Sequence, residues 1–194
     1  GQGVGARQLT ELISHLNDVL TEHLVAIVAA AHRIDLTQGC WLAFGSEGRS
    51  EQTVATDQDN GIVFASDDAE RDRPAWLAFA REVNDALDAC GYPLCKGGVM
   101  AMNPRWCASL AEWRDAFFGW IDRGDPESLL AANIFFDFRG LWGEIGLAET
   151  LRASGWPVRS TTRPVTLPVV PAPEIRGASA RTKQAAATTS GSRI

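Results

Sequence analysis

Two short apolar segments, residues 40–45 and 57–65, frame a polar stretch that strongly restricts how this part of the chain folds. Each segment has the length and the aromatic or branched residues of a buried strand. Gly45 ends the first segment with a residue that can turn sharply, and Ser46 then opens a short helix predicted over residues 47–53. Free N–H groups at such a turn favour an anion. The pattern therefore predicts a phosphate-binding corner between the two strands, made of Gly45, Ser46 and the short helix that follows them.

The second segment opens with two acids. Because side chains alternate along a strand, Asp57 and Asp59 are predicted to share one face, roughly 7 Å apart along the backbone. Carboxylates are hard ligands, and two of them can hold magnesium ions together with a triphosphate. Arg49 lies one helical turn beyond Ser46, where it can add a guanidinium fork to the phosphates or form a salt bridge to Glu51 or a nearby Asp.

The spacing of these motifs resembles that of the nucleotidyltransferase superfamily that includes DNA polymerase beta, with Gly-Ser, about ten residues, and Asp-x-Asp. A narrower resemblance is to the nucleotidyltransferase domain of bacterial signalling proteins, which often follows cyclic-nucleotide-binding or CBS domains and is related to the PII-protein uridylyltransferases. The matching motifs include GSEGRSEQ and TDQDN, and they lie at residues 45–52, 56–60, 98–101, 103–104, 106, 109–110, 112–113 and 134–139.

This resemblance implies an α+β fold of the polymerase-beta type, in which a small mixed sheet is flanked by helices and followed by an incomplete helical domain. We expect an N-terminal helical connector over residues 1–35 and the nucleotidyltransferase core over 36–104. The start of a helical substrate-binding domain is expected over 105–153. Residues 154–194 are rich in Pro, Thr, Ala and Ser without an apolar period, which predicts a disordered or non-native tail.

The implied function is metal-dependent transfer of UMP or another nucleotide from a nucleoside triphosphate to a protein side chain, as in [protein-PII] uridylyltransferases, within signal transduction. The cofactor would be Mg²⁺, with two ions and Mn²⁺ as a substitute, and the acceptor a PII-like protein. CBS or cyclic-nucleotide-binding domains would precede this region in a longer chain. The candidate residues are Asp57 and Asp59 for the metals and catalysis, Asp137 for catalysis, and Gly45, Ser46 and Arg49 for the nucleotide.

A third carboxylate, which many members of the superfamily place on a later strand, is missing from the matching segment. Residues 94–102 are predicted as the third strand and contain Lys96 but no acid. Asp137 and Glu144 are the available substitutes. Two alternatives to a protein-modifying enzyme therefore stay open: a catalytically silent module that senses nucleotide, and a small-molecule nucleotidyltransferase.

Asp137 itself has two interpretations. It is an acid within an apolar stretch, which indicates either a role in catalysis or a structural ion pair with Arg139 or Arg105.

Charge and hydropathy narrow the class of partner. The chain carries a net charge of −6, made of +5 over residues 159–194 and −11 over the remainder. An acidic body repels a nucleic-acid backbone, whereas a nucleoside triphosphate escorted by magnesium is acceptable. The longest uninterrupted apolar run, residues 24–31, is too short to cross a bilayer, and no leader opens the sequence. We therefore expect a cytoplasmic protein that binds neither nucleic acid nor membrane, with four reduced cysteines.

The remaining patterns predict helices. Apolar residues at three- and four-residue steps indicate one long helix, or two in succession, over residues 9–28. A second helix is predicted to start at Pro74 and to end before Gly91. Ser109 and Glu112 form a capping box before an apolar helix, and Asp125-Pro126 opens another that continues to residue 141.

Overall fold

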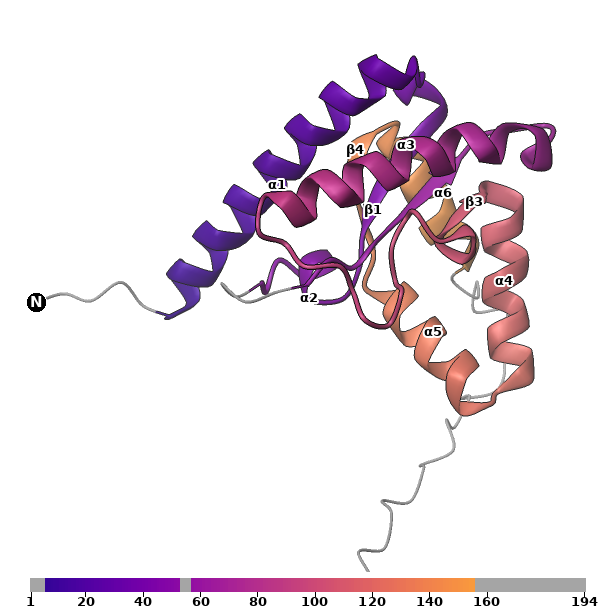
Figure 1. Ribbon diagram of the computed structural model, residues 1–194. Coiled ribbons are helices and arrows are strands. Elements are labelled where there is room, and N and C mark those ends of the chain that lie inside the picture. Colours follow the sequence, from indigo (N-terminus) through magenta and orange to yellow (C-terminus); the bar gives the residue numbers. More distant parts are fainter. Residues whose placement is uncertain (1–5, 53–56, 156–194) are drawn as a thin grey trace, which may run out of the picture. The chain divides into compact units, whose positions relative to one another are not determined.

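The computed structural model describes residues 6–52 and 57–155. In this part of the chain it contains six α-helices and a small four-stranded mixed sheet, which confirms the predicted α+β class (Figure 1). In chain order the elements are α1 (Ala6–His32), β1 (Gly39–Ala43), α2 (Gly45–Gly48), β2 (Asn60–Phe64), α3 (Ala69–Ala89), β3 (Cys107–Ser109), α4 (Leu110–Arg123), α5 (Pro126–Phe136), β4 (Arg139–Gly143) and α6 (Ile145–Gly155).

The sheet has the strand order β3-β2-β1-β4. β1 pairs antiparallel with β2 on one side and with β4 on the other, and β3 lies parallel to β2. Ala43 pairs with Asn60, and the next step of the ladder is a hydrogen bond of 2.9 Å from the amide of Phe44 to the carbonyl of Asp59. This register brings the turn that follows β1 next to the segment that precedes β2.

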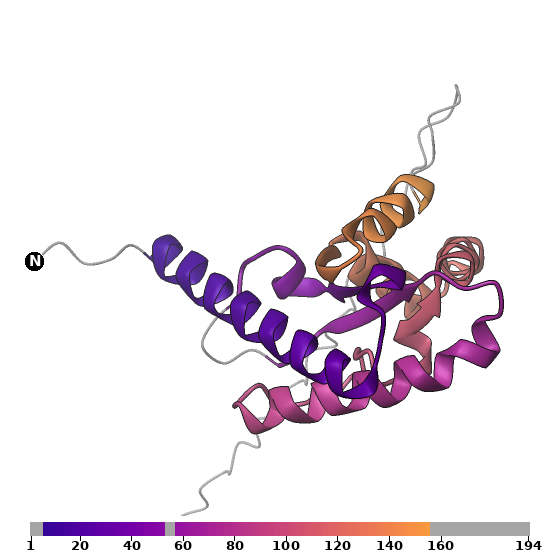
Figure 2. The same cartoon turned by 90° about the horizontal axis from the view of Figure 1, so that it is seen from above.

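Helices cover both faces of the sheet, as the view from above shows (Figure 2). Trp41, Ile62 and Phe64 pack with α1 and α3, whereas Leu42 and Val63 pack with α4, α5 and α6. The two hydrophobic clusters follow directly from the alternation of side chains along β1 and β2. The strands are buried on both faces, which explains why they lack a polar alternation in the sequence.

Of the two alternatives that the N-terminal pattern predicted, one long helix or two in succession, the structure has the single helix, α1. Its second half packs on α3 through Val25, Val28 and Ala29. Among the described residues it is the one helix that by length and composition could cross a membrane, and a helix in the core of a soluble protein passes the same test.

The predicted third strand over residues 94–102 is wrong. This segment forms turns, in which the amide of Gly98 bonds to the carbonyl of Cys95 and the amide of Asn103 to that of Met100. The third strand is instead β3, which begins after a short 3-10 turn at Pro104–Trp106. The glycine pair in the segment, with Gly98 at φ +67°, favours turns over a ladder.

Three helix boundaries also differ from the prediction. The short helix predicted over residues 47–53 is α2, which spans only Gly45–Gly48. α3 begins at Ala69, because the side chain of Asp68 caps it by accepting a hydrogen bond from the amide of Arg71, and Pro74 consequently lies inside the helix. α5 ends at Phe136, and residues 139–143 form β4 rather than more helix. The edge of β1 is paired by β4, a long-range interaction that local periodicity does not register.

The other capping predictions are confirmed. Ser109 and Glu112 form the reciprocal capping box at the start of α4, and Asp125 caps α5 through the amide of Ser128. Residues 105–153, expected to start a helical domain, supply α4, α5 and most of α6 but also β3 and β4. They share one compact unit with the core, spanning residues 1–158. Most of the predicted tail, residues 156–194, lies outside the described residues.

All four cysteines are free thiols. Cys40 and Cys107 are buried, and burial raises the pKa of each to about 12. These two thiols are therefore unreactive parts of the core.

Candidate functional site

The turn after β1 lies directly against one of the two acids. Gly45 has a φ of +53°, and a Cβ placed on it would lie 3.0 Å from Oδ2 of Asp59. The left-handed backbone and the close approach both require glycine here. Ser46 follows at the start of α2, so the corner and the acid pair belong to one site.

Asp57 and Asp59 lie in the extended segment just before β2 and have different environments. Asp57 is exposed and Asp59 is partly buried. Burial raises the pKa of Asp59, the charge of Asp57 raises it further, and a hydrogen bond with the thiol of Cys95 opposes the increase. Among the described residues neither carboxylate forms an ion pair with Lys or Arg. The pair therefore concentrates negative charge without neutralising it.

Buried amides hold the backbone of this segment in place. Asn84 of α3 donates from Nδ2 to Oε1 of Gln58 at 2.7 Å and to Oδ1 of Asn60 at 2.9 Å. Gln58 in turn donates to the carbonyls of Asn84 and Tyr92, and Asn60 accepts from the amide of Ala101 at 2.9 Å. Gln58 lies between the two acids in the sequence and Asn60 directly follows Asp59. Their side chains are therefore anchored to α3 and to the loop over residues 92–102 on either side of Asp59.

A second set of polar contacts joins the corner to α1. Asn17 donates to Oε1 of Gln52 at 2.9 Å, and the amide of Gln52 donates to Oγ of Ser14 at 3.2 Å. The hydroxyl of Tyr92 also bonds to Asn17. Because Gln52 is only 2% exposed, this contact is internal, and it fastens the end of the corner to the inner face of α1.

An additional acid, Glu47, lies within the corner itself. It is 6% exposed, and burial raises its pKa to about 8. The charges of Asp18 and Asp59 raise that pKa further, while Arg139 opposes them. Arg139 donates to Oδ1 of Asp18 at 2.6 Å and to the carbonyl of Glu47 at 3.2 Å, so β4, α1 and α2 meet at one guanidinium.

Arg49 forms the salt-bridge alternative that the sequence left open. Its Nε lies 2.8 Å from Glu51, and its Nη1 lies 2.8 Å from Asp137 at the end of α5. The ion-pair partner of Asp137 is therefore Arg49, whereas Arg105 pairs with Glu127 and Arg139 with Asp18.

A cavity of about 420 Å³ lies beside this ion pair. Arg49, Asp137 and Arg152 line it together with Gly48 and aromatic side chains of α4 and α5. Its walls combine π faces with two guanidinium groups, a chemistry suited to a planar or anionic group.

Each substitute for a third carboxylate has a partner of its own among the described residues. Asp137 is held by Arg49, and Glu144 bonds to the amide of Gly146 beyond the far end of β4. Within residues 6–52 and 57–155, no group of three His, Cys, Asp or Glu side chains is placed to hold a metal.

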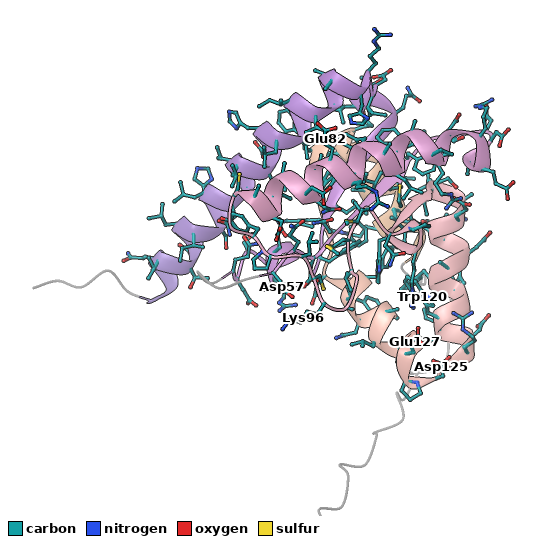
Figure 3. All side chains as sticks on the ribbon, viewed as in Figure 1. Asp57, Glu82, Lys96, Trp120, Asp125 and Glu127 are labelled. Carbon is teal, nitrogen blue, oxygen red and sulfur yellow. The ribbon has the colours of Figure 1, made fainter. Side chains whose placement is uncertain are left out.

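Lys96 is exposed in the loop that carries Cys95, and Figure 3 displays it and Asp57 in the region of α2.

Two carboxylates fit the metal that the sequence implied. Magnesium in proteins is commonly bound by one or two carboxylates, with waters and substrate phosphates completing its shell. Asp57 and Asp59 supply such hard oxygen donors, uncompensated by any described cationic side chain, beside a glycine corner.

Sequence reasoning missed three residues that support the site. Asn84 and Asn17 are buried amides within apolar helices, and Glu47 is a buried acid inside the motif. The first two had a detectable signal, because a polar residue on the inward stripe of an amphipathic helix requires a partner. Glu47 had none, because its burial depends on α1 and β4.

Comparison with known proteins places the chain in a family. No curated protein and no solved structure matches it. A family model described as "Putative nucleotidyltransferase DUF294" matches residues 1–127, about two thirds of the chain. This match covers the corner, the acid pair and the helices that hold them, and the chain belongs to this nucleotidyltransferase family.

Proposed function

We propose that this chain is a metal-dependent nucleotidyltransferase that transfers UMP or another nucleotide from a nucleoside triphosphate to a side chain of a signalling protein of the PII type. The main support is the contact between Gly45 and Asp59, which joins a phosphate-binding corner to a pair of unneutralised acids. Membership of the family supports nucleotidyl transfer. The choice of UMP and of a PII-like acceptor follows the sequence resemblance, as do the signalling role and the CBS or cyclic-nucleotide-binding domains upstream.

In the proposed reaction an acceptor hydroxyl attacks the α-phosphorus, a new oxygen–phosphorus bond forms, and pyrophosphate leaves. Asp57 and Asp59 would hold one or two Mg²⁺ ions, or Mn²⁺ in their place, which neutralise the charge that grows on the entering and departing oxygens. Gly45 and Ser46 would bind the β- and γ-phosphates through backbone amides and the hydroxyl. Because Gly45 lacks a side chain, the triphosphate can approach the backbone next to Asp59.

Arg49 and Asp137 have linked roles in this proposal. Both side chains are about two-fifths exposed, so their ion pair is weak and can be exchanged for a stronger contact. A guanidinium released from Asp137 would bind a phosphate in a bidentate manner. Asp137 would then be free beside the cavity, where it could orient the acceptor hydroxyl.

A direct test is label transfer from each of the four α-³²P ribonucleoside triphosphates, with Mg²⁺ and a purified PII-type protein. We expect transfer from one or two nucleotides and no transfer after addition of a metal chelator. Label incorporation that persists in the Asp57→Asn, Asp59→Asn double variant would refute the assignment of these acids.

One observation favours a second candidate, a catalytically silent module that senses nucleotide. No third carboxylate among the described residues joins the acid pair, and Asp137 is engaged by Arg49. For such a module, calorimetry should show Mg²⁺-dependent binding of nucleotide. The label-transfer assay should show no transfer to any acceptor. Transfer to an aminoglycoside or a similar small hydroxyl compound would instead support the small-molecule enzyme.

A further inference from the structure

The outer face of α1 carries large apolar side chains that nothing in the compact unit covers. Four of them are about half exposed or more: Leu9 49%, Leu12 53%, Leu16 57% and Ile27 66%. Their spacing places them on one side of the helix. In both views the first turns of α1 extend beyond the neighbouring helices (Figures 1 and 2).

The inner face of the same turns is polar. Ser14, Asn17 and Thr21 are 2–5% exposed, and two of them bond to Gln52 of the corner. The first half of α1 thus reverses the usual arrangement of an amphipathic helix, with its polar side packed inward and its apolar side toward solvent. An exposed apolar stripe of this kind marks a surface that another molecule covers.

The stripe follows a seven-residue repeat, which is typical of helices that pair along their length. With Leu9 at position a, nine of the ten side chains at positions a, d and e are apolar. Position a holds Leu9, Leu16, His23 and Ala30, position d holds Leu12, Val19 and Ala26, and position e holds Ile13, Leu20 and Ile27. The positions that face the sheet fall outside this set.

We propose that the outer stripe of α1 binds the same stripe of a second copy of this chain, with the two helices antiparallel about a two-fold axis near residues 17 and 18. In this register Leu9 lies against Ala26 of the second copy, Leu12 against His23 and Leu16 against Val19. At the flanking positions, Glu22 lies opposite His15 of the second copy. A two-fold interface repeats each of these contacts, so the Leu9–Ala26 and Glu22–His15 pairs each occur twice, and each His23 meets a leucine.

A parallel pair is less complementary. It would place His23 against its own copy within the apolar seam and stack alanine on alanine at the C-terminal end of the stripe.

A lipid surface fits the stripe less well than a protein does. Helices that lie on membranes carry Lys and Arg along their polar edge. Residues 8–32 contain no Lys or Arg, and the acids at residues 11 and 22 border the stripe. Anionic lipid would therefore repel this helix.

The size of the stripe predicts a weak dimer. A helix of 27 residues is about 40 Å long, and a stripe roughly 10 Å wide covers about 400 Å² on each copy. A standard stable interface uses about 800 Å² per partner. Self-association should therefore depend on concentration, with monomer dominant in dilute solution.

The test is sedimentation velocity of the full chain from about 1 to about 500 µM, where a weak dimer is visible. We expect a reversible monomer–dimer equilibrium whose dissociation constant rises at least about tenfold in Leu12→Glu and in Leu16→Glu. Leu130→Glu is the matched control, because Leu130 is 60% exposed on α5 and should leave the equilibrium unchanged. Thermal unfolding of each variant measured in dilute solution should match that of the parent, since the substituted side chains are exposed.

Orientation is tested by disulfide trapping in a Cys90→Ser background, because Cys90 is the exposed native thiol. Leu9→Cys mixed with Ala26→Cys should give a cross-linked heterodimer, and Leu9→Cys alone should not. Cross-linking of Leu9→Cys to itself would overturn the antiparallel pairing. A monomer at every concentration would overturn the interface. The interface between copies would also be overturned if the chain co-sedimented with neutral phosphatidylcholine vesicles and Leu12→Glu abolished that co-sedimentation.

Discussion

The charged side chains on the two sides of the corner formed by α2 differ in whether they have a partner of opposite charge. On one side Asp57 and Asp59 lie together without a basic partner among the described residues, and burial raises the pKa of Asp59. On the other side Arg49 bonds to two acids, and its charge is satisfied. Both sides belong to the same motif, so motif membership alone does not separate a ligand-binding group from a structural one. The unsatisfied side is where binding energy is still available to a ligand.

The strongest way to break this comparison is to remove the charge of the acid pair. We expect Asp57→Asn combined with Asp59→Asn to lower the rate of label transfer by at least about a thousandfold, because the oxygens proposed to bind the metal are lost. The melting temperature should stay the same or rise, since the substitutions remove the repulsion between two acids and the cost of burying Asp59. Nucleotide-dependent transfer and thermal unfolding measured on the same preparations provide the two readouts. A lower melting temperature would mean that the acids stabilise the fold instead.

The next largest effect should come from the corner. Gly45→Ala puts a side chain into a left-handed backbone and within 3.0 Å of Asp59, so we expect transfer to fall roughly 10- to 100-fold. Gly124→Ala is the matched control, because Gly124 has a similar φ of +60° at the end of α4 and its added Cβ would meet nothing closer than 3.9 Å. Both variants should lose a similar amount of stability, and only the first should lose activity. Equal loss of activity would assign the effect of Gly45 to general destabilisation.

These expectations combine what the sequence predicted with what it did not. Residues 40–45 were predicted as a strand, and the capping box at Ser109 was predicted as well, because strand composition and capping are local signals. The strand at 139–143 was not, because it depends on the edge of β1, a partner far along the chain. The turns over 94–102 were not predicted either: the glycine pair was a local signal for them, but the side chains of Asn60 and Asn84 that hold the segment are distant in sequence. The motif, like the capping box, could be predicted because its signal is local in the sequence. The partners of its residues could not, because they lie far along the chain.

The site shows the same division. The alternation of Asp57 and Asp59 with Gln58 and Asn60 is a local property, and the structure holds the two amide side chains against α3. The choice of Asp137 as the partner of Arg49, 88 residues away, is a property of the assembled fold. Spacing along the chain could identify both residues but not their contact.

A smaller effect is expected from Glu47, which connects the charged side of the corner to the fold. Its pKa is raised from 4.5 to about 8, so between these values the folded chain holds a proton that the unfolded chain has lost. The free energy of unfolding should therefore fall by roughly 1–3 kcal/mol as the pH rises from about 5 to about 8. Glu47→Gln should flatten this dependence and be the more stable protein at pH 8. Denaturant unfolding at several pH values measures it, with and without Mg²⁺ and nucleotide. A steeper dependence in the variant would contradict the raised pKa.

The last prediction concerns Arg49 and Asp137, and it decides whether Asp137 acts on substrate or only restrains Arg49. If it only restrains the guanidinium, Asp137→Asn releases Arg49 and should tighten nucleotide binding about threefold, whereas Arg49→Ala should weaken it about tenfold. The catalytic rate at saturating nucleotide should then change little in Asp137→Asn. If Asp137 instead orients the acceptor hydroxyl, that rate should fall by a hundredfold or more while nucleotide affinity still rises. Glu51→Gln is the matched control, because it removes the other partner of the same guanidinium without altering an acid beside the cavity. A rate loss in Asp137→Asn that Glu51→Gln does not reproduce would therefore come from the carboxylate itself, and the satisfied side of the corner would contain a catalytic group after all.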